Sequence, residues 1–107
     1  MKVYDLRDPA GRVFAFEISN TWFRRTDLIR FVGSIPGVSL LPREARRDET
    51  RDEFCQFLFR GRQFVAWEPW SDNSRYWIGP DPPEWCEEIS ELREAFAARK
   101  TWPWERK

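Results

Sequence analysis

The chain has 107 residues, eighteen acidic and eighteen basic side chains that give a formal net charge of zero, and no histidine. This length fits a single domain. Nucleic-acid-binding proteins normally show a basic excess or a clustered basic face, so the charge balance argues against such a partner. The absence of histidine removes Ser–His–Asp and Cys–His nucleophilic sites and most transition-metal ligand sets. We therefore expect a protein that is not an enzyme and uses neither a metal nor another cofactor.

The sequence also bears on where the protein works. No apolar run approaches the ~20 residues that a membrane-spanning helix needs. The first residues lack the apolar segment of a signal peptide. Two cysteines, Cys55 and Cys86, make neither a disulfide framework nor a metal set. We expect both to be small packed thiols, Cys86 in the first turn of a helix, and we predict a cytoplasmic location without membrane contact.

The first third of the chain predicts a hairpin, a helix and a short strand. Apolar residues alternate over 4–6 and 13–18 around a Pro- and Gly-containing turn at 8–11, which is typical of a β-hairpin. Residues 19–21 then supply helix N-cap candidates, with a second candidate within 24–27, and an apolar stripe runs from Trp22 to Val32. Gly33 is a plausible helix end. A strand over 38–41 would follow.

The middle of the chain contains a charged stretch and a second hairpin. Residues 42–53 carry almost no apolar side chain, which predicts a mobile loop, or alternatively a docking loop that orders on binding. Alternation over 54–59 and 63–67 around Arg60-Gly61 strongly indicates a hairpin. It predicts Cys55, Phe57 and Phe59 on one face of the first strand and Phe54, Gln56 and Leu58 on the other. Residues 75–78 would form another strand, closed by Gly79-Pro80.

The last element has the clearest helix signals. Asp81 is a candidate N-cap, Pro82 suits the first helical position, and Glu84 stands three residues after the cap. Trp85, Ile89, Leu92 and Phe96 then follow at helical spacing. The pattern predicts a helix from about residue 82 with these four side chains along one face.

These elements predict an α+β fold: a mainly antiparallel sheet of about five to six strands with two helices packed on one face. The predicted order is β-β-α-β-β-β-β-α. We expect a single domain over residues 1–100 and a tryptophan-containing tail over 101–107. The predicted core draws on both hairpins and both helices: Phe14, Phe16, Ile18, Ile29, Val32, Phe57, Phe59, Val65, Ile89, Leu92 and Phe96.

The best indication of function is an excess of tryptophan. The chain has seven, three of them at positions 67, 70 and 77. A core of this size has room for only a few, and surplus aromatic surface commonly marks a binding site. We expect Trp67 in the core, Trp102 and Trp104 folded back onto the sheet, and Trp70 partly exposed on a turn. The predicted partner-binding residues are Trp70, Asp72, Asn73, Arg75 and Trp77.

Two functions remain open at this stage. The first is a non-catalytic bacterial protein that acts through protein–protein interaction, such as an immunity protein, antitoxin, chaperone or regulator. The second is a small-molecule binding domain or enzyme accessory subunit, in which Arg75 and Tyr76 help to line an aromatic pocket. The oligomeric state does not follow from the sequence.

Overall fold

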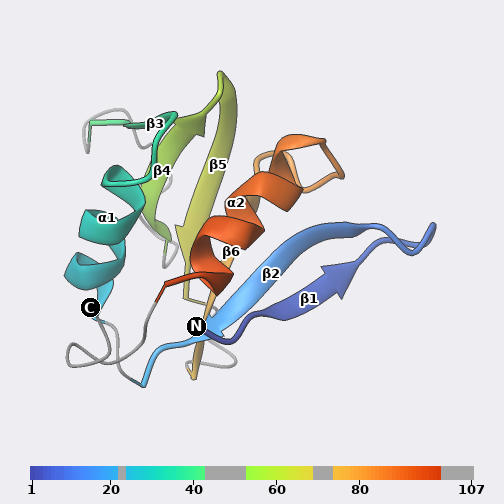
Figure 1. Ribbon diagram of the computed structural model, residues 1–107, viewed down its shortest axis with the longest axis horizontal. Coiled ribbons are helices and arrows are strands. Elements are labelled where there is room, and N and C mark those ends of the chain that lie inside the picture. Colours follow the sequence, from blue (N-terminus) through green and yellow to red (C-terminus); the bar gives the residue numbers. More distant parts are fainter. Residues whose placement is uncertain (22–23, 43–52, 69–73, 100–107) are drawn as a thin grey trace.

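A computed structural model describes residues 1–21, 24–42, 53–68 and 74–99 of the chain. Its order of elements is the predicted one, and its sheet is antiparallel with the strand order β1-β2-β6-β5-β4-β3. Both helices lie on one face of the sheet (Figure 1). The predicted α+β fold is therefore confirmed. The elements are β1 Tyr4–Arg7, β2 Val13–Ser19, α1 Arg25–Gly33, β3 Val38–Leu40, β4 Glu53–Phe59, β5 Arg62–Trp67, β6 Arg75–Pro80 and α2 Glu88–Ala97.

Both predicted hairpins form, and each turn has a local cause. Arg60 and Gly61 both have positive φ angles, 52° and 84°, as a two-residue type I′ turn requires. In the β1–β2 turn the Asp8 carboxylate accepts hydrogen bonds from the backbone N–H groups of Ala10 and Arg12, both at 2.9 Å. These bonds to the ionised form lower the pKa of Asp8, and the N–H of Arg12 contributes most.

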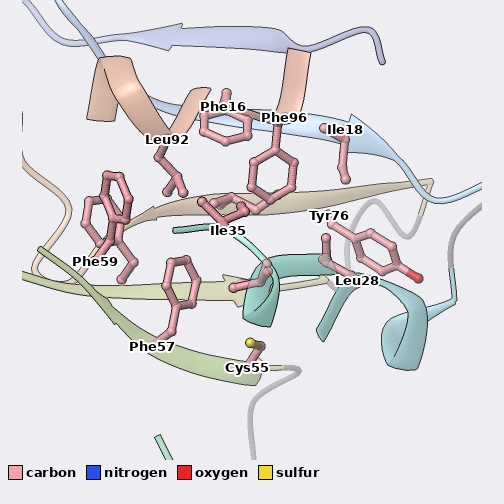
Figure 2. Packing of buried hydrophobic residues seen from close by; sticks show 14 of the residues in the cluster. Phe16, Ile18, Leu28, Ile35, Cys55, Phe57, Phe59, Tyr76, Leu92 and Phe96 are labelled. Carbon is pink, nitrogen blue, oxygen red and sulfur yellow. The ribbon is translucent and has the colours of Figure 1, made fainter. Parts of the chain in front are cut away.

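The core fills the space between the sheet and the two helices (Figure 2). The Phe96 ring on α2 meets Phe16 of β2 and Phe31 of α1 edge-on, with ring centres 5.1 and 5.0 Å apart. Phe57 stacks on Phe64 across the β4–β5 pair, at 5.7 Å. Of the predicted core, Phe14 and Ile29 are only partly buried, and Val65 is buried on the opposite face of the sheet. The remaining predicted residues are core: Phe16, Ile18, Val32, Phe57, Phe59, Ile89, Leu92 and Phe96.

Helix α1 begins later than the first predicted cap, because the sheet uses that segment. Ser19 is still in β2, and the N–H of Asn20 donates to the carbonyl of Ser74 at 3.0 Å, which extends the pairing with β6. The helix is instead capped at Arg24, whose N–H donates to the Asp27 carboxylate at 3.0 Å. Gly33 is the last helical residue, and Ser34 is the C-cap.

Helix α2 begins at Glu88, so the predicted start at Asp81-Pro82 is wrong. Pro80 still pairs with Phe64, and the N–H of Asp81 donates to Gln63 at 3.0 Å. Asp81 therefore continues the sheet, and the N–H of Glu84 donates to the carbonyl of Pro82 at 2.9 Å, which makes a tight turn instead of a helical one. Trp85 consequently falls outside the helical stripe and is 38% exposed. Cys86 lies before the helix rather than in its first turn, although it is buried as expected.

Phe54 also departs from the predicted alternation. The pairing of β4 with β5 shifts register between Glu53 and Cys55, as in a β-bulge. The shift allows Phe54 to turn toward the helices, where its ring meets Tyr76 edge-on at 5.2 Å and is 7% exposed. A bulge of this kind has no simple signature in the alternation of apolar residues.

Several predictions concern residues outside the described part of the chain. They include the loop over 43–52, Trp22, Trp70, and the tail with Trp102 and Trp104. Within the described ranges, neither helix is long and apolar enough to cross a lipid bilayer.

Candidate functional site

The sheet face opposite the helices carries a row of large side chains. Tyr4 pairs with Glu17, Glu17 with Trp77, and Trp77 with Trp67, across strands β1, β2, β6 and β5. Directly paired residues project from the same face of a sheet. Their sequence neighbours, such as Tyr76, point into the core instead. The expectation that Trp67 belongs to the core is therefore wrong, because Trp67 shares the outer face with Trp77.

Trp77 rests on its own strand. A Cβ atom built at Gly79 would stand 2.6 Å from Cη2 of Trp77 and 2.8 Å from the Cβ of Ala15. The six-membered ring of the indole thus occupies the space that a side chain at position 79 would need. Gly79 and Ala15 are buried on this face although no helix of the described residues covers it. The missing side chain at Gly79 therefore fixes the Trp77 ring against the sheet.

The second tryptophan adjoins the first. The ring centres of Trp67 and Trp77 are 6.1 Å apart and the ring planes meet at 59°. Both side chains are partly exposed. The two indoles form a tilted aromatic pair on a strand pair that holds both backbones in place.

Arg75 borders this pair. Its guanidinium carbon lies 3.6 Å from the centre of the Tyr4 ring, and its Nη1 donates to Oε1 of Glu17 at 3.2 Å. Stacking and ion pairing together restrict a side chain that is otherwise long and mobile. We refer to the five residues Tyr4, Glu17, Trp67, Arg75 and Trp77 as the sheet-face cluster.

The sheet-face cluster contains two of the five residues predicted to bind a partner, Arg75 and Trp77. The other three, Trp70, Asp72 and Asn73, lie outside the described residues. Tyr4 and Glu17 were missed because the pairing of β2 with β6 joins positions 58 residues apart, and Trp67 was missed because it was expected in the core. Arg75 and Tyr76, expected together beside a pocket, point to opposite faces of β6.

Both thiols and the Tyr76 hydroxyl lie inside the protein. Burial raises the pKa of the Cys86 thiol and of the Tyr76 hydroxyl, which keeps both groups protonated at neutral pH. Cys55 and Cys86 are buried free thiols. In the described ranges, His, Cys, Asp and Glu side chains form no group of three that is suited to hold a metal ion.

No protein-family model matches this chain, and no curated protein or solved structure is significantly similar to it. Function is therefore inferred from the geometry of the described residues.

Another exposed tryptophan, Trp85, lies outside the cluster in the loop before α2. Trp85 follows the exposed Pro82 and Pro83, and the guanidinium of Arg12 stands 4.8 Å from its ring centre. Arg12 is in turn paired with Asp8 at 3.1 Å. Trp85 therefore joins the loop before α2 to the β1–β2 turn. This contact was not predicted, because the spacing of Trp85 from Ile89 and Leu92 indicated a place on the helix.

Proposed function

We propose that this is a non-catalytic protein that binds another protein through the sheet-face cluster. The observation that supports the proposal is the tilted pair of Trp67 and Trp77 on a sheet face that no helix of the described residues covers. Tryptophan, tyrosine and arginine are the residues most enriched where interfaces concentrate their binding energy. The cluster contains four residues of these three types.

The charges of the cluster favour a protein over a nucleic acid. Its single arginine is paired with Glu17 and stacked on Tyr4, so it offers no stripe of free cations for phosphates. The restricted side chains also favour tight recognition, because little conformational entropy remains to be lost when a partner binds.

Among proteins of this class we favour a bacterial immunity protein, antitoxin, chaperone or regulator that acts in the cytoplasm. Two buried free thiols in a small domain agree with a reducing compartment. The small-molecule alternative stays a prediction, and no contact of the described residues favours it over a protein partner.

Affinity capture from the native lysate tests the proposal. Wild-type protein should retain a partner that Trp77→Leu loses, because leucine keeps apolar bulk over Gly79 but removes the indole. Trp85→Leu is the matched control, since it makes the same change on an exposed tryptophan outside the cluster. Both variants must unfold at urea concentrations close to that of wild type. A partner that Trp77→Leu and Trp67→Leu both retain at full yield would contradict the proposal.

A further inference from the structure

Cations of this chain lie over several of its own aromatic rings. Fifteen of the eighteen basic residues are arginine, whose planar guanidinium stacks on rings. The guanidinium carbons lie 3.6 to 5.1 Å from the ring centres. The pairs are Arg12 with Trp85, Arg25 with Phe54, Arg60 with Phe59, Arg75 with Tyr4, and Arg99 with Phe31.

The tryptophan pair of the sheet-face cluster differs. Among the described aromatic residues that are not fully buried, Tyr4, Phe31 and Trp85 lie under a cation of the same chain, whereas Phe14, Trp67 and Trp77 do not. An indole is the strongest π partner for a cation among the protein side chains. The two adjoining indoles are thus the best such surface in the described part of the molecule, and no cation of the described residues lies over either ring.

A carboxylate flanks the same surface. Glu17 is the direct cross-strand neighbour of Trp77, and its side chain is 19% exposed. Arg75 approaches Glu17 through Oε1 only, at 3.2 Å, while its guanidinium lies over Tyr4. A second guanidinium placed over Trp77 would therefore lie next to a second indole and to a carboxylate.

We propose that the Trp67–Trp77 pair binds an arginine side chain of the partner protein, an assignment that rests on the proposed function. A guanidinium can lie flat on an indole while its edge donates to a carboxylate, and it is less strongly hydrated than the ammonium of lysine. The chain already makes this arrangement once, where Arg75 stacks on Tyr4 and donates to Glu17. Trp77 is the neighbour of Glu17 on the other side.

The probe for this site is N-acetylarginine methylamide, and its matched control is N-acetylcitrulline methylamide, which has nearly the same shape but no charge. Indole N–H resonances of ¹⁵N-labelled protein report binding at each tryptophan. We expect Trp67 and Trp77 to bind the arginine compound about two- to fivefold more tightly than the citrulline compound, the ratio for an exposed cation–π contact. Trp77→Leu should abolish this preference at Trp67.

Trp85 supplies an internal control, because Arg12 already covers it. It should show no preference for arginine in wild-type protein and should gain one in Arg12→Gln. Equal binding of both compounds at Trp67 and Trp77, or no response from either indole, would overturn the assignment. The four arginines of residues 43–52 can also be replaced by glutamine. If the indoles prefer the arginine compound only in that variant, an arginine of the same chain binds them in wild-type protein, and this result would also overturn the assignment.

The two proposals fail separately. If Trp77→Leu loses its captured protein but wild-type protein does not prefer the arginine compound, the proposed function stands and the arginine assignment is wrong. If wild-type protein prefers arginine but Trp77→Leu and Trp67→Leu both retain the partner at full yield, the cluster binds guanidinium yet is not the interface. This second result also contradicts the arginine assignment, because the assignment names the partner's side chain.

Discussion

The indole of Trp77 takes the place of a side chain at Gly79, with its Cη2 atom 2.6 Å from where a Cβ would stand. Glycine in a strand is unfavourable unless another group uses the space it leaves. Here an aromatic ring of the same strand does so, and the ring is thereby held in one position. Trp77, one of the predicted site residues, is thus anchored on its own strand.

Gly79→Ala should therefore destabilise the protein. The added methyl group meets Trp77 and also the Cβ of Ala15, which is fixed to the backbone of β2. We expect a loss of about 1–3 kcal/mol in the free energy of unfolding, as for other overpacked sites, measured by urea denaturation. The Trp77 indole resonance should shift because the ring must move.

Gly33→Ala is the matched control for that change. Its added Cβ would stand 2.9 Å from Cδ1 of Leu40, but Leu40 is 44% exposed and can rotate away. Because alanine is a better helix former than glycine, the variant should be as stable as wild type or up to about 1 kcal/mol more stable. Equal destabilisation by the two substitutions would show that the contact of Trp77 with Gly79 has no special effect.

A second prediction concerns the link between α2 and the edge strand β1. Arg93 donates to the Asp5 carboxylate from Nε at 2.6 Å and from Nη2 at 3.2 Å, and this bond raises the pKa of Arg93. The two side chains are 28% and 24% exposed, so solvent screens the pair in part. Arg93→Met should cost about 1 kcal/mol of unfolding free energy after that discount.

Glu94→Gln provides the comparison for Arg93. Glu94 also lies near Arg93, at 3.2 Å, but its side chain is 74% exposed. Its substitution should change the free energy of unfolding by less than about 0.5 kcal/mol. A double-mutant cycle of Arg93→Met with Asp5→Asn should show a favourable coupling, and additive effects would mean that the bidentate pair does not stabilise the fold.

The fold was predictable because most of its signals are local. Alternation over 54–59 and the Arg60-Gly61 turn determine one hairpin within a few residues of each other, and the first hairpin forms in the same way. The start of α2 was not predictable in this manner. Asp81 has the sequence features of a helix cap, but its N–H donates to Gln63 on a neighbouring strand, a tertiary contact that the local sequence does not reveal. The N–H of Glu84 then donates to Pro82, so a tight turn forms where the helix was expected.

The candidate site was predictable only in part for the same reason. Arg75 and Trp77 were identified from local composition. Tyr4 and Glu17 belong to the cluster only because β2 pairs with β6, and the residues near position 17 do not predict that pairing. Trp67 was assigned to the wrong face because alternation defines two faces without saying which one the helices cover.

A third prediction follows from the lowered pKa of Asp8. A carboxyl group whose pKa is lower in the folded than in the unfolded protein adds stability above its unfolded value, near 4, and this contribution is lost as the pH falls through the folded value. Asp8→Asn keeps a side-chain acceptor for the turn but removes the charge. The variant should therefore be less stable than wild type at neutral pH, and the two should converge in acid.

Urea denaturation of both proteins from pH 7 to about pH 3 measures this difference. Asp8→Ala separates charge from turn geometry, because it also removes the acceptor of the Ala10 and Arg12 N–H groups. It should stay destabilised at every pH. If the difference in unfolding free energy between wild type and Asp8→Asn stays constant or grows as the pH falls, the prediction is wrong.

The last prediction concerns Trp70, whose chain segment joins the sheet-face cluster at both ends. Strand β5 ends at Trp67 and β6 begins at Arg75, both members of the cluster. Glu68, the residue after β5, is held by Asn20 at 2.8 Å and by Arg25 at 2.8 and 3.0 Å. The segment that carries Trp70 therefore connects two strand ends that both belong to the proposed interface.

Trp70→Ala should weaken partner binding by about 2 kcal/mol or more while leaving the free energy of unfolding almost unchanged. If Trp70 were a core residue, the same substitution would instead lower the free energy of unfolding by roughly 3–5 kcal/mol. Urea denaturation and binding to the captured partner, measured on the one variant, separate these outcomes. Trp70→Phe serves as the conservative control, because it keeps an aromatic ring and should recover part of the binding. Loss of stability without a separate loss of binding would assign Trp70 to the scaffold and leave Trp67 and Trp77 as the aromatic centre of the interface.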